Sequence, residues 1–130
     1  MLLSKEFVFD AAHNLVNYHG KCEKLHGHTY KLQIVLEGTP DSEGMVMDFC
    51  ELSDIVKKHV ISRLDHSYIN DFIAQPSAEN IAIWVWHEIE EKVKRENCNL
   101  YEVHVWETAT SCVILRKDDF NEKVCMCINN

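Results

Sequence analysis

The residues of this sequence whose types and spacing best suit chemistry are His13, His26 and His28. Only Gly27 separates His26 from His28, and alternate residues of a β-strand point to the same side, so their imidazoles project together. Gly27 lets the backbone pass close to whatever these side chains hold. Three neutral imidazoles suit Zn²⁺, and a centre without a fourth protein ligand keeps the open position of a catalytic zinc site.

Two predicted strands position these histidines. In the first, residues 3–12, alternation places the large apolar side chains on the side that His13 continues. In the second, residues 27–37, His28 lies on the same side as Tyr30. If the two strands pair as a hairpin, the three imidazoles meet at one end of the core.

Two helices follow, and each has a recognisable N-cap. Asp48 is followed by Glu51 in the pattern of a capping box, and an apolar stripe continues to about Arg63. Ser77 begins the second helix, whose apolar residues again recur at helical spacing. The two helices therefore lie next to each other in the chain.

The remaining elements complete an α+β pattern. Residues 64–75 show little regular pattern, whereas residues 101–108 and 111–117 form a predicted hairpin with a tight connection. The order strand, strand, helix, helix, strand, strand predicts a four-stranded antiparallel sheet with two helices on one face.

Composition narrows the class of protein. The 130 residues, 46% of them hydrophobic, make one domain, 1–130, with an ordinary core. A net charge of −8 argues against a nucleic-acid binder. We expect a cytoplasmic protein with no membrane partner, because we find neither a signal-peptide core nor an apolar run of spanning length. The six cysteines are scattered, which argues against a disulfide scaffold.

A structural metal site is the alternative to a catalytic one. Cys22 could complete a tetrahedron with the three histidines and leave no open position. Such a non-catalytic module would lose its fold on chelation. A catalytic centre would leave a folded, inactive protein.

Five short motifs, in the same order, carry a resemblance to a known family. They are Phe9-Asp10-Ala11-Ala12-His13, Cys22-Glu23-Lys24-Leu25-His26-Gly27-His28, Met47-Asp48-Phe49, Leu64-Asp65-His66 and Trp106-Glu107-Thr108. Together they resemble the family of 6-pyruvoyl-tetrahydropterin and 6-carboxy-tetrahydropterin synthases. The resemblance extends from about Phe7 to Arg116.

The resemblance implies a fold, an assembly and a set of site residues. It implies the tunnelling fold, whose subunits join edge to edge into a trimer or hexamer with pockets between subunits. The residue roles that it implies are zinc ligands at His13, His26 and His28, a base at Cys22, a catalytic pair at Asp65 and His66, and a pterin anchor at Glu107.

The resemblance also implies a substrate, 7,8-dihydroneopterin triphosphate. The short gap between Cys22 and His-Gly-His is similar to that of the 6-carboxy-tetrahydropterin synthases of queuosine biosynthesis, which release acetaldehyde and triphosphate. The pyruvoyl-forming members have a longer gap. A third branch uses Glu-x-x-His-Gly-His to make 6-hydroxymethyl-dihydropterin for folate, and Glu23 matches that pattern. We therefore predict that Cys22 supports the carboxy route and Glu23 permits the hydroxymethyl route.

Overall fold

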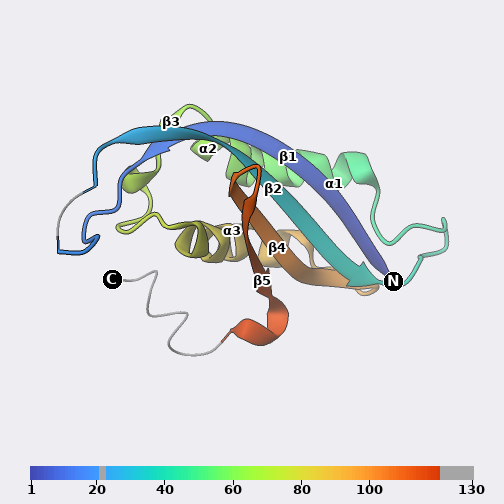
Figure 1. Ribbon diagram of the computed structural model, residues 1–130. Helices are drawn as coiled ribbons and strands as arrows, with labels where there is room; N and C mark the ends of the chain where they lie inside the picture. Colours follow the sequence, from blue (N-terminus) through green and yellow to red (C-terminus); the bar gives the residue numbers. More distant parts are fainter. Residues whose placement is uncertain (21–22, 121–130) are drawn as a thin grey trace.

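The computed structural model describes residues 1–20 and 23–120, so Cys22 lies outside the described residues. A long antiparallel hairpin dominates it, formed by β1 (Leu2–His13) and β2 (His26–Gly38) (Figure 1). The register places Phe9 opposite Tyr30 and His13 opposite His26. The predicted hairpin is therefore confirmed, with the histidines at the end where residues 14–25 connect the two strands.

The sheet has five strands, in the order β3-β1-β2-β4-β5. The second hairpin joins β4 (Cys98–Thr108) to β5 (Ser111–Arg116), as predicted. The expectation of four antiparallel strands was wrong by one strand, because β3 (Ser67–Tyr68) runs parallel to β1. Its two residues lie in a segment without alternation, and only tertiary contact with β1 makes them a strand.

The first helical segment changes type along its length. It runs through α1 (Phe49–Val56), a π-helical stretch (Lys57–Ile61) and α2 (Ser62–Leu64), and so ends where the sequence predicts. The carboxylate of Asp48 accepts hydrogen bonds from the N–H groups of Cys50 and Glu51, which confirms the N-cap. Glu51 does not complete the expected capping box through its side chain, because its carboxylate accepts a 2.6 Å hydrogen bond from Arg95 instead.

The second main helix, α3 (Ala78–Val93), begins at the predicted cap. The Ser77 hydroxyl accepts a hydrogen bond from the N–H of Asn80. Short 3₁₀ turns at Ile69–Asp71 and Lys117–Asp119 flank the remaining connections.

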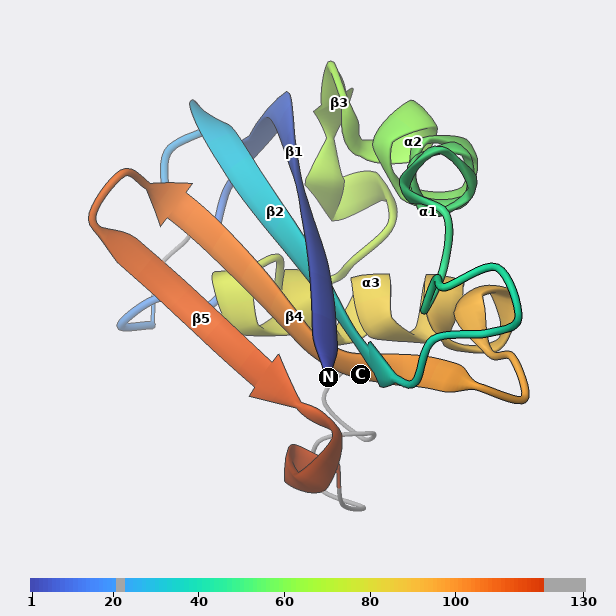
Figure 2. The ribbon, with the colours of Figure 1, turned by 90° about the vertical axis from the view of Figure 1, so that its right-hand side faces the viewer.

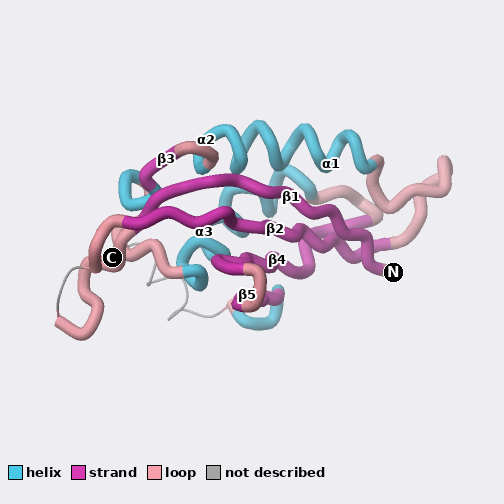
Figure 3. The backbone as a smooth tube through the Cα atoms, turned by 45° about the horizontal axis from the view of Figure 1, so that its top comes forward, coloured by secondary structure: helices cyan, strands magenta, loops and turns pink. Residues whose placement is uncertain are grey.

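Both helices lie against the same face of the sheet (Figures 2 and 3). The core fills the space between these layers with alternate strand residues and the apolar stripes of the helices. Its fully buried members include Phe9, Tyr30, Leu32, Ile34, Leu36, Leu52, Val56, Ile81, Val85, Ile89, Val103 and Val105. Burial of each large aliphatic side chain stabilises the fold by about 1.5–3 kcal/mol. The chain thus has the α+β architecture that the pattern predicts.

The face of the sheet away from the helices carries exposed and charged side chains. Val8 and Ile114 are exposed there. Glu102 is the exception, because His104 and Arg116 cover it and donate hydrogen bonds of 2.9 and 2.6 Å to its carboxylate.

Candidate metal centre and active site

The three predicted ligands, His13, His26 and His28, come together at the end of the hairpin where β1 leads into the connection to β2. One imidazole nitrogen from each lies within 4.8 Å of the others. Nε2 of His13 lies 3.1 Å from Nε2 of His26, and the ring of His28 lies 5.1 and 4.7 Å from the rings of His13 and His26. Three nitrogens at this spacing could hold one metal ion.

Main-chain carbonyl groups set the orientation of two of the imidazoles. Nδ1 of His13 lies 2.8 Å from the carbonyl oxygen of Pro76, and Nδ1 of His26 lies 2.9 Å from that of Lys24. A carbonyl oxygen only accepts hydrogen bonds, so each Nδ1 carries the proton and each Nε2 keeps its lone pair. Two facing lone pairs fit a cation between them, and this backing is the usual outer shell of a metal-bound histidine.

The third imidazole is poised to remain neutral. Burial lowers the pKa of His28, as do His13 and His26, whereas Glu107 acts in the opposite direction. Nε2 of His28 is buried without a hydrogen-bond partner among the described residues. A neutral imidazole with a free nitrogen is the form that binds a metal ion.

Glu107 lies beside this centre, as the resemblance implies. Its Oε1 is 3.5 Å from Nε2 of His28. The same carboxylate lines a cavity of about 220 Å³ next to the first residues of α3, Ala78 and Glu79. A carboxylate at the mouth of a cavity can accept hydrogen bonds from a ring that presents N–H groups.

Tyr30 forms the floor of the centre, and the sequence reasoning did not single it out. Its ring lies edge-on to His13 and His28 at 5.9 and 5.5 Å between centroids. Burial, together with Glu107 and Glu23, raises the pKa of Tyr30, so its hydroxyl stays protonated. Its alternation with His28 was visible in the sequence, but it was indistinguishable there from an ordinary core aromatic residue.

Asp65 and His66 form a pair at the outer edge of β1. Nδ1 of His66 lies 3.1 Å from the carboxylate of Asp65, and His66 adopts a positive φ of 59°. The N–H of Asp10 donates to Asp65, and the N–H of His66 donates to the carbonyl of Asp10, at 3.0 and 2.6 Å. The Asp10 N–H is the main reason that the pKa of Asp65 is lowered. The backbone of β1 therefore fixes the pair.

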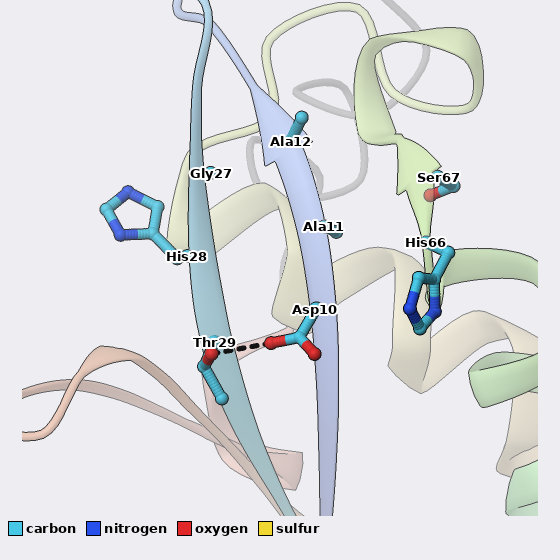
Figure 4. Close-up of a pocket in the computed structure, with 8 residues that line it drawn as sticks. All are labelled: Asp10, Ala11, Ala12, Gly27, His28, Thr29, His66 and Ser67. Carbon is cyan, nitrogen blue, oxygen red and sulfur yellow. Dashed lines mark hydrogen bonds between the residues drawn. The ribbon is translucent and has the colours of Figure 1, made fainter.

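A hollow of about 510 Å³ extends over the ends of β1 and β2. Its lining includes His28 on one side and His66 on the other, with Asp10 and Thr29 between them (Figure 4). Thr29 donates a 2.5 Å hydrogen bond to Asp10. In this view the imidazoles of His28 and His66 lie on opposite sides of the two strands.

Glu23 lies beside the metal centre. Its Oε1 accepts a hydrogen bond from the N–H of Leu15 at 3.2 Å and lies 3.7 Å from Nδ1 of His26. The carboxylate therefore approaches His26 from the side opposite to Nε2. Cys22, the residue before it, lies outside the described residues.

Several basic residues that could meet an anionic substrate have other partners. Lys31 lies over the ring of Trp106, Lys5 over that of Phe49, and Arg63 over that of Trp84. Lys24, beside His26, is exposed and forms no ion pair with the residues described. In the part of the chain that the structure describes, no helix is long and apolar enough to cross a membrane.

Comparisons with known proteins agree with this geometry. Residues 2–118 match the model of the 6-pyruvoyl tetrahydropterin synthase family. The 6-carboxy-5,6,7,8-tetrahydropterin synthase of Synechocystis sp. is 38% identical over 85% of this chain and 88% of its own. The protein of that name from Haemophilus influenzae is 34% identical over 84% and 94% of the two chains.

Two further comparisons extend the range of relatives. The dihydroneopterin monophosphate aldolase of Pyrococcus furiosus is 37% identical over 76% of this chain and 82% of its own. The structure of Caenorhabditis elegans 6-pyruvoyl tetrahydropterin synthase shares the fold, with a TM-score of 0.73, 21% identity and coverage of 89% and 94%. The family match over nearly the whole chain, together with these relatives, shows that the chain belongs to the 6-pyruvoyl tetrahydropterin synthase family.

Proposed function

We propose that this protein is a zinc-dependent lyase that converts 7,8-dihydroneopterin triphosphate and water to 6-carboxy-5,6,7,8-tetrahydropterin, acetaldehyde and triphosphate, a step toward queuosine. The observation that carries this proposal is the three-histidine centre, in which Nε2 of His28 is unpaired among the described residues and lies beside Glu107. The relatives named 6-carboxy-5,6,7,8-tetrahydropterin synthase support the choice of product. So does the short Cys-x-x-x-His-Gly-His spacing at Cys22.

The residues around the centre would have different roles in the reaction. Zinc, when bound by His13, His26 and His28, would supply Lewis-acid chemistry to the hydroxyl groups of the substrate side chain. Cys22 would remove a proton from a side-chain carbon as its thiolate.

Residues on other elements would bind the pterin ring and exchange protons with the substrate. Glu107 would hold the pterin ring through its N–H groups. His66, oriented by Asp65, would exchange protons near neutral pH.

We propose that the active unit is a homo-oligomer, a trimer or hexamer, in the cytoplasm. In one chain the imidazoles of His28 and His66 lie on opposite sides of the two strands, and we propose that a neighbouring copy supplies His66 to a substrate at the centre. The outer strands of the sheet, β5 and the two-residue β3, offer edges for such assembly.

A second product remains a specific alternative. Glu23 lies 3.7 Å from Nδ1 of His26, and the match to a dihydroneopterin monophosphate aldolase shows that side-chain cleavage of another kind occurs among relatives. We infer that Glu23 permits formation of 6-hydroxymethyl-7,8-dihydropterin for folate. Formation of 6-pyruvoyl-tetrahydropterin is the third possible outcome.

The alternative to an enzyme is a non-catalytic protein module with a structural zinc site. In that case Cys22 would complete a closed zinc site with the three histidines. The protein would then unfold when a chelator removes the metal, whereas the enzyme would stay folded and lose activity.

The deciding experiment is incubation of the zinc-loaded protein with 7,8-dihydroneopterin triphosphate, followed by mass spectrometry of the products. Formation of 6-carboxy-tetrahydropterin supports the proposal. The Cys22→Ala and Glu23→Ala variants then separate the routes, because we expect the first to lose the carboxy product and the second the hydroxymethyl product. If the protein is folded and binds zinc but turns over none of the substrate, the proposal that it is an enzyme is refuted.

A further inference from the structure

Tyr30, whose ring contacts His13 and His28, carries a hydroxyl group without a hydrogen-bond partner among the described residues. Tyr30 is 0% exposed, and its hydroxyl is unpaired in that part of the chain. The same holds for Nε2 of His28, two residues earlier on β2. Buried polar atoms usually find partners, so a pair of orphans on one face of one strand requires an explanation.

The packing of Tyr30 accounts for its ring but not for its hydroxyl. The ring stacks on Phe9, with centroids 5.0 Å apart and planes 10° apart, and its edge meets His13 and His28. A phenylalanine would make the same contacts. It would also avoid the penalty of an unpaired buried hydroxyl.

Tyr30 lies against the metal centre through its ring. The edge of the ring meets two of the three predicted ligands, His13 and His28, at 5.9 and 5.5 Å between centroids. Glu107 lies beside the same His28, 3.5 Å from its Nε2. The unpaired hydroxyl therefore belongs to a side chain that packs directly on the metal centre.

We propose that Tyr30 donates a hydrogen bond to an oxygen atom of the molecule that occupies the three-histidine centre, a hydroxyl of the substrate side chain or a water molecule. The hydroxyl of Tyr30 and Nε2 of His28 are both buried and unpaired among the described residues, so an oxygen held at the centre can serve the first while a metal ion occupies the second. That oxygen supplies the missing acceptor. The inference rests on the proposed function, since a hydroxylated pterin is taken as the main occupant.

The test is the Tyr30→Phe variant. Its matched control is Tyr101→Phe, which removes the same hydroxyl group from the first half of β4, away from Glu107 near the end of that strand. Calorimetry on the zinc-loaded proteins compares 7,8-dihydroneopterin, which has side-chain hydroxyls, with 6-methyl-7,8-dihydropterin, which has none. We expect Tyr30→Phe to bind dihydroneopterin about ten-fold more weakly and the methyl compound with unchanged affinity. Tyr101→Phe should change neither.

Thermal unfolding with and without zinc provides a second readout. We expect zinc-free Tyr30→Phe to melt no lower than the wild type, because it loses an unpaired group. If both pterins bind it normally but zinc raises its Tm less than that of the wild type, the oxygen is that of water, which also supports the proposal.

Two results would overturn it. One is a lower Tm of the zinc-free variant with unchanged pterin binding and an unchanged zinc-induced shift, which would mean that the hydroxyl serves the fold. The other is an equal loss of affinity of Tyr30→Phe for both pterins. If the wild type binds neither pterin, the proposed function fails, and the zinc-induced shift in Tm still decides whether Tyr30 serves an oxygen at the centre.

Discussion

Oε1 of Glu107 lies 3.5 Å from Nε2 of His28, so the proposed pterin anchor touches a proposed metal ligand. The two residues come from neighbouring strands, β4 and β2, and their contact joins the two halves of the site. A substitution of Glu107 should therefore also affect metal binding, and a substitution of His28 should also affect pterin binding.

We predict that neutralising Glu107 weakens pterin binding. Glu107→Gln keeps the shape of the side chain but loses the charge that strengthens hydrogen bonds from the pterin ring. A loss of about 1.5–3 kcal/mol for a charged hydrogen bond corresponds to pterin affinity lower by roughly ten- to hundred-fold. Calorimetry measures this affinity, with the exposed Glu90→Gln on α3 as control. Normal pterin binding by Glu107→Gln would contradict the assigned role.

We predict that zinc stabilises the protein through the three histidines. At a free zinc concentration about 1,000 times the dissociation constant, binding adds about 4 kcal/mol to the free energy of unfolding. His26→Ala, whose side chain is 36% exposed in the wild type, should keep its fold and lose this increment. Thermal unfolding checks the shift, and the exposed His87→Ala should respond to zinc as the wild type does. An equal zinc response in His26→Ala would place the metal elsewhere.

We predict that two inactive variants restore activity when they share an oligomer. His26→Ala removes a metal ligand and His66→Ala removes the proton carrier, so each alone should be inactive. If a site takes these residues from different copies, random mixing by unfolding and refolding leaves about a quarter of the sites intact. Activity in the mixture, compared with each variant refolded alone, is the measurement. A mixture as inactive as its components would show that one chain supplies both groups.

We predict that Glu102 contributes to stability in a pH-dependent way. Burial opposes its ionisation, but hydrogen bonds from His104 and Arg116 outweigh it and lower the pKa of Glu102 below 4.5. The contribution is therefore complete above about pH 4.5 and is lost as the pH falls through the lower pKa of the folded state. Glu102→Gln should destabilise the protein by about 1–3 kcal/mol at pH 7 and by less at pH 3. Urea unfolding at both pH values tests this, with the exposed Glu96→Gln as control; a gap that does not narrow at pH 3 would argue against the ion pairs.

Local patterns made much of the fold predictable. Strict alternation fixed the faces of β1 and β2, and with it the meeting of His13, His26 and His28 at one end. Side-chain caps at Asp48 and Ser77 fixed the starts of the two helices. These signals act within a few residues of the chain, which is why they can be read directly.

What could not be predicted depends on contacts between distant segments. The strand β3 exists because it lies beside Ala11 and Ala12, and Arg95 draws Glu51 away from its cap. The hydroxyl of Tyr30, which has no partner among the described residues, depends on how its ring packs against Phe9 and His13 on β1. No local pattern distinguishes such residues from ordinary core or surface residues.

The orientation of the metal ligands by main-chain atoms affects how the site can evolve. His13 is backed by the carbonyl of Pro76 and His26 by that of Lys24. Because every residue type supplies a carbonyl, the exposed side chain at position 24 is free to change while the imidazole of His26 stays in place, whereas the buried Pro76 is also held by its packing. A one-residue insertion or deletion in the segments that carry these carbonyls would displace the backing oxygen. The centre should therefore tolerate changes of residue identity in these loops far better than changes of loop length.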